Sequence, residues 1–165
     1  MAPRTKVLFL CVGNACRSQM AEAIAKHVAS DVIDPSSAGL VAFGEITGPT
    51  LVVLSEHGIS ADGQHSKTLR SEDMSGTELL INMSGRSSAA IFDAPTPPSE
   101  DWDVGDPFGF NLAIYRKIRD QIEARVEDLA RRLREKVNSA QNPQAAGTGI
   151  EKEPDKEPET DTDAA

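Results

Sequence analysis

The chain has 165 residues, of which 39% are hydrophobic and 26% charged, a composition typical of one globular domain. Its formal net charge of −9 disfavours nucleic acid as a partner, because phosphate neutralisation needs clustered Lys and Arg. The apolar run at residues 7–12 is too short for a membrane span or a signal-peptide core, so we expect a cytoplasmic protein with no membrane partner.

The first part of the chain alternates between strand and helix patterns. Residues 7–10 form a continuous apolar run, typical of a buried parallel strand, and apolar residues then recur at helical spacing over residues 20–28. Residues 32–33 indicate a short second strand that ends at a Pro-Ser-Ser turn. Residues 49–57, closed by Gly58, carry the start and stop signals of a second helix.

The alternation continues in the second part. Residues 78–83 indicate a third strand, and a passage rich in Ser, Asp and Pro follows. Over residues 115–137 the apolar residues step by three or four, which predicts a long amphipathic closing helix. Alternating strands and helices predict an α/β fold, a three-layer α/β/α sandwich around a central parallel sheet of four strands.

The end of the chain differs in composition. Residues 138–165 contain no aromatic residue and one Ile, too little apolar area to offset the entropy of ordering. Seven carboxylates against two lysines within this segment leave it with a net charge of −5. We expect one domain at residues 1–137 and a disordered acidic tail at 138–165, whose role is either solubility or docking and regulation.

The turn after the first strand has the features of an oxyanion site. In open parallel sheets, ligands bind at the carboxyl ends of the strands, and a helix N-terminus attracts anions. Gly13 and Asn14 tolerate the backbone angles of a loop that wraps a tetrahedral oxyanion. Arg17 follows in the first helical turn, where its guanidinium can make two parallel hydrogen bonds. The predicted binding residues of this phosphate-binding loop are Val12, Gly13, Asn14, Ala15, Cys16 and Ser18.

Cys11 precedes this loop. A cysteine in an apolar strand can be an inert core residue, but the loop, the helix terminus and Arg17 favour a thiolate that attacks phosphorus. The leaving alkoxide then needs a proton. In the stretch WDVGDPFGF, Pro107 restricts the backbone of Asp106, which makes Asp106 the candidate general acid and, later, general base. An Asp-Pro pair is also a common turn, so only the combination supports this role.

Metal and cofactor sites are not expected. His27, His57 and His65 are scattered, and the two cysteines have poor spacing for zinc. The predicted ligands are therefore inorganic phosphate or other oxyanions, bound without a metal.

From about residue 6 to 137 the sequence resembles the low-molecular-weight protein tyrosine phosphatase family and the related thiol-dependent arsenate reductases. The resemblance lies in CVGNACRS at 11–18, SAG at 37–39, HGI at 57–59 and DPFG at 106–109. It implies the same roles as above: nucleophile, oxyanion binder and general acid for Cys11, Arg17 and Asp106. It further implies that Asn14 and Ser37 hydrogen-bond each other to hold the loop. Cys16 would trap oxidised Cys11 as a reversible disulfide.

Two aromatic residues bear on the substrate. By the resemblance, Phe43 and Phe108 occupy positions that wall the pocket of the phosphatases, where they would sandwich an aryl phosphate such as phosphotyrosine. They can also be ordinary loop anchors. The family's second aromatic residue after Asp-Pro is replaced by Gly109.

The resemblance leaves two enzyme classes open. Gln19, within RSQMAEA, is more similar to the reductases. A three-cysteine relay is excluded, because the places of the two further cysteines fall on Ser84 and near Ile91. The main hypothesis is a phosphatase acting on phosphotyrosine proteins or other aryl phosphates. The alternatives are an arsenate reductase that uses an external thiol (glutathione or mycothiol, with a glutaredoxin) and an idle oxyanion-binding module.

Overall fold

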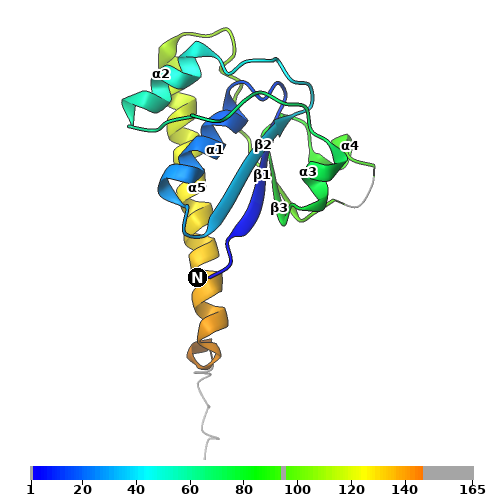
Figure 1. Ribbon diagram of the computed structural model, residues 1–165, viewed down its shortest axis with the longest axis vertical. Helices are drawn as coiled ribbons and strands as arrows, with labels where there is room; N and C mark the ends of the chain where they lie inside the picture. The colour runs from blue at the N-terminus through cyan, green and yellow to red at the C-terminus, as the bar shows by residue number, and fades with distance from the viewer. Residues whose placement is uncertain (1, 94–95, 147–165) are drawn as a thin grey trace, which may run out of the picture.

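A four-stranded, entirely parallel sheet forms the centre of the molecule, as predicted (Figure 1). The computed structural model describes residues 2–93 and 96–146. The strands are β1 (Thr5–Cys11), β2 (Ile33–Gly39), β3 (Leu79–Asn82) and β4 (Ser99–Asp101). Their order in the sheet is β2-β1-β3-β4, so β1 is an inner strand with a neighbour on each side.

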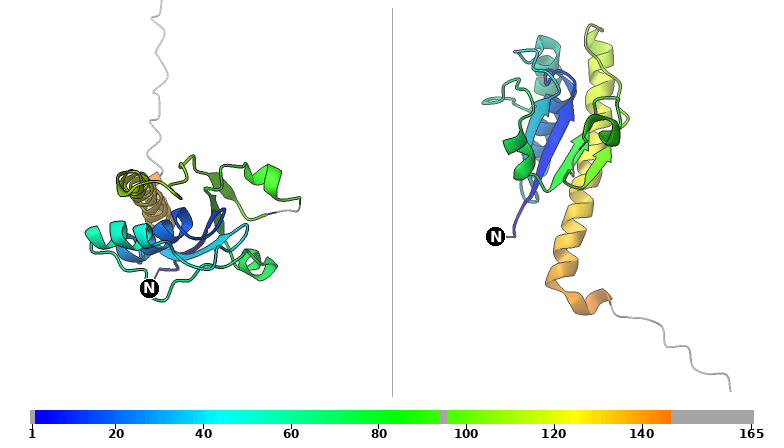
Figure 2. Two further views of the ribbon diagram at one scale, coloured as in Figure 1. Left: turned by 90° about the horizontal axis from the view of Figure 1, so that it is seen from above. Right: turned by 90° about the vertical axis from the view of Figure 1, so that its right-hand side faces the viewer.

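Helices cover both faces of this sheet (Figures 1 and 2). They are α1 (Arg17–Val28), α2 (Gly48–Glu56), α3 (Ser71–Ser75), α4 (Ser88–Ile91) and α5 (Leu112–Gln141), followed by the 3₁₀ turn η1 (Pro143–Ala146). The side chains of α1, α2 and α5 share one large core with one face of the sheet. A smaller core lies on the other face, where Met74 of α3 and Phe92 after α4 pack. The predicted three-layer sandwich is thus confirmed.

The apolar run in β1 reflects this double coverage. Successive side chains of a strand point to opposite faces. Val7, Phe9 and Cys11 belong to the large core, whereas Leu8 and Leu10 belong to the small one. Because both faces are buried, every position from 7 to 11 is apolar, and Cys11 ends the strand at the carboxyl edge of the sheet.

The second strand is longer than predicted. It runs from Ile33 through Pro35 to Gly39, so the expected turn at Pro-Ser-Ser is wrong. β2 is an edge strand that pairs only with β1 within the sheet. Proline is tolerated on such an edge, because its missing N–H removes no hydrogen bond of the sheet interior.

Three short elements escaped the periodicity analysis. They are α3, α4 and β4, and both α4 and β4 lie inside the passage rich in Ser, Asp and Pro. Elements of three to five residues are too short to show a period. What defines β4 is its pairing with β3, through the hydrogen bonds Leu80 N–H to Pro98 O and Trp102 N–H to Asn82 O.

The closing helix continues past the boundary predicted at residue 137. α5 begins after Asn111, whose side chain accepts the N–H of Ile114, and extends to Gln141 beyond the end of the sheet (Figure 1). Residues 138–141, predicted to belong to the tail, are therefore helical, since hydrogen bonds within the helix propagate beyond its last core contact at Leu133. Residues 143–146, which were also assigned to the tail, form η1, and residues 147–165 lie outside the described residues. Across the described ranges, every helix is too short or too polar to cross a membrane.

Candidate active site

The loop between β1 and α1, residues 12–16, is held by the segment that follows β2. Backbone N–H groups of residues 40–47 donate to four loop carbonyls at 3.0–3.1 Å. These carbonyls belong to Cys11, Val12, Gly13 and Ala15. In a trans peptide group, the N–H of one residue points in the direction opposite to the C=O of the residue before it. The N–H groups of residues 12, 13, 14 and 16 therefore point away from this segment, where they can donate to an oxyanion.

Asn14 organises the interior of the loop. It is fully buried and has a left-handed φ of 49°, a conformation that Asn tolerates better than most residues. Its Oδ1 accepts from Gln19 Nε2 and from the backbone N–H of Lys67, both at 2.9 Å. With Oδ1 so placed, Nδ2 donates to Ser18 Oγ at 2.8 Å and to Ser37 Oγ at 3.0 Å. The bond between Asn14 and Ser37 that the resemblance implied is thus present.

Ser18 links this network to the thiol. Its Oγ lies 2.9 Å from Cys11 Sγ, and both side chains are buried. Because Ser18 Oγ already accepts from Asn14, its own proton can be donated to the sulfur. A hydrogen bond to a thiolate stabilises the charged form, which is the form that acts as nucleophile.

Arg17 occupies the far side of the loop. Its Nη1 donates to the carbonyls of Met83 at 2.6 Å and Val104 at 3.1 Å, which anchors the guanidinium to the ends of β3 and β4. Its Nε is fully buried and is the one such side-chain nitrogen or oxygen without a hydrogen-bond partner in the described part of the chain. A buried N–H without a partner is costly, so this donor indicates a position for an oxyanion.

Asp106 comes to the same pocket from the loop after β4. Its Oδ2 lies 3.4 Å from Arg17 Nη2, and its Oδ1 accepts the backbone N–H of Phe108 at 3.1 Å. Half of this side chain remains exposed, which is suitable for a group that exchanges protons with a ligand and with water. Cys11, Arg17 and Asp106 line one pocket together with Phe43 and Phe108. The structure thus brings together the three residues predicted to be catalytic.

Comparison with known proteins identifies the fold and loop. The family model for "Low molecular weight phosphotyrosine protein phosphatase" matches residues 6–139. The chain belongs to this family. The resemblance seen in the motifs is confirmed, and the match extends over most of the chain.

Relatives of this family member include both enzyme classes considered above. The chain is 31% identical over 135 residues to a glutaredoxin arsenate reductase of Synechocystis sp., covering 78% of this chain and 98% of the relative. It is 30% identical over 141 residues to a protein-arginine-phosphatase of Geobacillus stearothermophilus, with coverages of 78% and 95%. A solved low molecular weight protein tyrosine phosphatase from T. tengcongensis superposes with a TM-score of 0.69 at 31% identity, with coverages of 78% and 99%.

In this family member, two aromatic rings stand at the mouth of the pocket. Phe43 and Phe108 touch edge to face, with centroids 5.3 Å apart, and each is half exposed. The Phe43 ring lies against Gly13 so closely that a Cβ there would be 2.5 Å from it. Both predicted rings therefore line the pocket, but they contact each other, so an aryl ring would have to separate them to be sandwiched.

Glu22 supports the loop and was not anticipated from the sequence. It is buried in α1, where its Oε2 accepts the hydroxyl of Ser37 at 2.5 Å and its Oε1 pairs with Lys26 at 2.7 Å. Ser37 in turn accepts from Asn14. One signal was available: Glu22 follows Ser18 by four residues, so both lie on one face of the helix.

The second cysteine has its own environment. Cys16 Sγ lies 3.4 Å from Thr47 Oγ1 and 3.5 Å from Tyr115 OH, two residues that the sequence did not single out. Burial raises the pKa of Tyr115 to about 12, so its hydroxyl stays protonated at neutral pH. Both cysteines are free thiols. The role of Cys16 as a trap for oxidised Cys11 stays a prediction.

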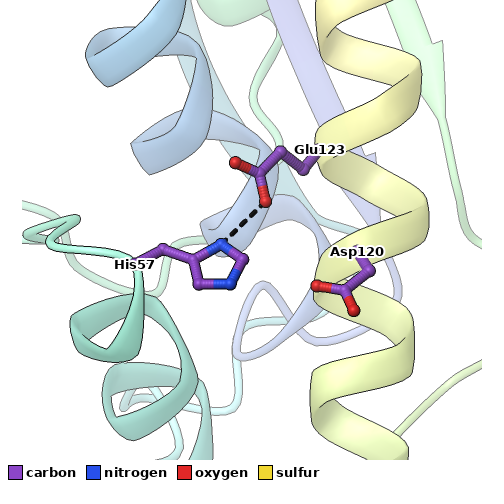
Figure 3. A group of neighbouring side chains, drawn as sticks. All are labelled: His57, Asp120 and Glu123. Carbon is purple, nitrogen blue, oxygen red and sulfur yellow. Dashed lines mark hydrogen bonds and ion pairs between the residues drawn. The ribbon is translucent and has the colours of Figure 1, made fainter.

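A histidine and two carboxylates meet outside this pocket (Figure 3). His57, at the end of α2, faces Glu123 and Asp120 of α5, and its Nδ1 lies 2.8 Å from Glu123 Oε2. One atom of each residue lies within 4.8 Å of the others, a grouping that could hold a metal ion. Asp120 also pairs with Arg119 at 2.9 Å. The bond between His57 and Glu123 joins the end of α2 to α5, which is a structural role.

Proposed function

We propose that the protein is a phosphatase that hydrolyses phosphotyrosine through a cysteinyl-phosphate intermediate. The observation that carries the proposal is the pocket itself, in which the buried, unpartnered Nε of Arg17 lies with Cys11 and Asp106. An oxyanion bound to Arg17 and the loop amides would satisfy this donor.

In the first step, Cys11 Sγ attacks phosphorus. The sulfur–phosphorus bond forms as the bond from phosphorus to the tyrosyl oxygen breaks, and protonated Asp106 gives its proton to that oxygen. Arg17 and the loop N–H groups hold the three remaining oxygens. Asp106 lines the same pocket as Cys11 and Arg17, which supports this assignment.

In the second step, a water molecule attacks the phosphorus of the intermediate. Asp106, now ionised, takes a proton from the water as the sulfur–phosphorus bond breaks. Inorganic phosphate leaves, and Cys11 returns as a thiolate that the Ser18 hydroxyl stabilises. No metal ion takes part in this scheme.

The aromatic mouth supports an aryl ester as substrate. Phe43 and Phe108 provide apolar ring surface next to the pocket, where a tyrosyl ring can stack once the two rings part. Free oxyanions have no ring for this surface to bind.

Arsenate reduction with an external thiol is the second candidate. The similarity to a glutaredoxin arsenate reductase favours it. The sequence contains two cysteines, so a relay through three is excluded. Two external thiols would then supply the electrons, becoming a disulfide as arsenate becomes arsenite and water.

Kinetics with competing substrates tests the proposal. The purified protein is assayed with para-nitrophenyl phosphate and with matched peptides that carry phosphotyrosine, phosphoserine or phosphoarginine. A further assay follows arsenate-dependent oxidation of glutathione with glutaredoxin. We expect turnover of the aryl phosphate and the phosphotyrosine peptide, at rates well above those for phosphoserine.

The variants Cys11→Ser and Asp106→Asn serve as controls. The first should abolish turnover, and the second should reduce it most for aryl esters with poor leaving groups. Faster turnover of phosphoarginine than of phosphotyrosine would contradict the proposed substrate, since one relative is a protein-arginine-phosphatase. Arsenate reduction without phosphatase turnover would move the assignment to the second candidate.

A further inference from the structure

Most of the large apolar side chains that are exposed lie in the two segments that line the mouth of the pocket. Among the described residues, the exposed large hydrophobic side chains are Val41, Phe43, Leu51, Val52, Phe108, Phe110 and Leu112. Five of them lie at residues 41–43 or 108–112, the two stretches that supply Phe43 and Phe108 to the pocket, whereas Leu51 and Val52 lie on α2. Exposed apolar residues scattered singly need no explanation, but a cluster of them indicates an interaction site.

Hydrogen bonds place one half of this cluster beside the phosphate-binding loop. The backbone N–H groups of Val41 and Phe43 donate to Val12 O and Gly13 O, both at 3.0 Å. Val41 is 63% exposed, so its side chain remains on the surface although its backbone is fixed.

The other half of the cluster is in the turn that carries Asp106. Phe108 and Phe110 lie on either side of Gly109, and the N–H of Phe110 donates to Pro107 O at 2.9 Å, which closes the turn. Phe110 is 63% exposed. The edge-to-face contact between Phe43 and Phe108 joins the two halves across the pocket mouth. We define Val41, Phe43, Phe108 and Phe110 as the apolar rim.

We propose that the apolar rim binds polypeptide, namely the apolar residues immediately next to the phosphorylated tyrosine of a substrate protein. This inference rests on the proposed function, because the rim surrounds the pocket that receives the phosphate. The rim offers apolar area to residues on both sides of the tyrosine, from Val41 in one loop and Phe110 in the other.

The chemistry of the rim and of the whole chain selects this partner. Apolar flanking residues gain by leaving water, at about 25 cal/mol per Å² of buried apolar surface. Acidic flanking residues would meet a chain whose net charge is −4 over residues 1–137, in addition to the −5 of the acidic segment. A free oxyanion such as arsenate binds within the loop and leaves Val41 and Phe110, the outer part of the rim, in water. The apolar surface of these two side chains can therefore contribute only to the binding of a larger substrate.

Two phosphotyrosine peptides test the proposal directly. One carries Leu and Ile at the two positions on each side of the phosphotyrosine, and the other carries Ser and Gly there. For the wild-type protein, we expect kcat/KM to be about tenfold higher for the apolar peptide, mostly through a lower KM. Para-nitrophenyl phosphate, which cannot reach the outer rim, is the reference substrate.

The double variant Val41→Ser, Phe110→Ser removes the outer rim without touching the pocket residues. We expect it to lose most of the preference for the apolar peptide while its turnover of para-nitrophenyl phosphate changes less than twofold. The matched control is Leu51→Ser, Val52→Ser, which removes two exposed apolar side chains of α2 outside the rim and should keep the preference.

A binding measurement separates this inference from the proposed function. Fluorescence anisotropy with the Cys11→Ser protein reports peptide binding whether or not the wild-type protein turns over. Tighter binding of the apolar peptide, lost in the rim variant, supports docking. Equal affinities for both peptides would overturn the inference. So would a rim variant whose kcat/KM falls by the same factor for the apolar peptide and for para-nitrophenyl phosphate. Absence of turnover with peptide discrimination intact would reject only the proposed function.

Discussion

The hydroxyl of Ser18 connects the buried amide network to the thiol. It accepts a hydrogen bond from Asn14 and lies 2.9 Å from Cys11 Sγ. The orientation of the Asn14 side-chain amide therefore directs the hydroxyl proton of Ser18 toward the sulfur. Asn14 in turn is held by Gln19, Ser37 and the backbone of Lys67. The environment of the Cys11 thiol therefore depends on Gln19, Ser37 and Lys67, which do not line the pocket.

Ser18→Ala tests this dependence. A hydrogen bond to a charged group contributes about 1.5–3 kcal/mol, so we expect turnover of para-nitrophenyl phosphate to fall about tenfold to a hundredfold. Alkylation of Cys11 by iodoacetamide at pH 7 should slow in parallel. Ser55→Ala, on the exposed side of α2, is the control. An unchanged alkylation rate would show that Ser18 does not stabilise the thiolate.

Arg17→Lys tests the guanidinium. Arg17 anchors itself to Met83 O and Val104 O through Nη1 while its Nε remains for the ligand. A lysine ammonium cannot do both, because it is a single point charge without a planar fork. We expect kcat/KM to fall about a hundredfold or more, with weaker inhibition by inorganic phosphate. A near-wild-type kcat/KM would contradict the assigned position of the oxyanion.

At the scale of elements, the end of β2 touches the phosphate-binding loop. A Cβ on Gly39 would lie 2.7 Å from Asn14 N and 2.8 Å from Val12 O, which are backbone atoms that cannot move aside independently. Gly39 N–H also donates to Lys67 O, and Leu69 N–H donates to Gly39 O. The close approach of strand and loop therefore requires glycine at this position.

Gly39→Ala should push the loop out of place. We expect the free energy of unfolding to fall by about 1–3 kcal/mol and inhibition by phosphate to weaken, measured by urea unfolding and by steady-state kinetics. Gly76→Ala is the matched control, since its φ is −96° and nothing lies within 4 Å of the added Cβ. Equal effects of both substitutions would indicate that replacing either glycine changes stability in the same way, and would contradict a specific contact between residue 39 and the loop.

An ion pair between elements gives a pH-dependent prediction. Arg134 of α5 donates to both oxygens of Asp31 at 2.8 Å, and these hydrogen bonds lower the pKa of Asp31 below its ordinary value of 3.8. Because the folded-state pKa is the lower one, the stabilisation is complete above the unfolded pKa and is lost as the pH falls through the folded one. The relevant window therefore lies below about pH 4.

Asp31→Asn should destabilise the protein slightly at pH 7. The side chain is 56% exposed, so solvent screening limits the loss in the free energy of unfolding to at most about 1 kcal/mol. Urea unfolding at pH 7 and pH 3 measures it, and the difference from wild type should shrink at pH 3. The control is Asp62→Asn, at another exposed position. A difference that grows on acidification would contradict the sign of the pKa shift.

At the scale of the whole molecule, the candidate site borders the large core, since Cys11, Ala15 and Cys16 belong to both. The last side chain of this core is Leu133, the family match ends at residue 139 and α5 ends at Gln141. Deleting residues 147–165 should therefore leave Tm and kcat/KM for para-nitrophenyl phosphate unchanged. A deletion from residue 130 onward, which removes Ala130 and Leu133 from the core, should lower Tm markedly. A large effect of the shorter deletion would assign the acidic segment a role in folding or catalysis.

Much of the architecture could be predicted because its signals are local. The run in β1, the helical spacing in α1 and α5 and the Gly-Asn turn are each contained within one stretch of sequence. Four strands were expected, but β4 could not be located, because three residues carry no period and their partner strand is 19 positions away in register. The prediction at Pro35 was wrong because a local signal was followed where the sheet decides. Proline is typical of turns, but the edge strand β2 tolerates it.

By itself, the sequence determined the loop that follows Cys11 and its place at the carboxyl end of a buried parallel strand, since both follow from residue type and local period. Only the tertiary structure decided that Glu22 and Tyr115 lie behind that loop and that Val41 and Phe110 extend the rim around it. Glu22 meets Ser37 across 15 positions and Cys16 meets Tyr115 across 99. The apolar rim joins two loops that are more than 60 residues apart. Such contacts arise from chain crossovers between parallel strands, and no local pattern records them.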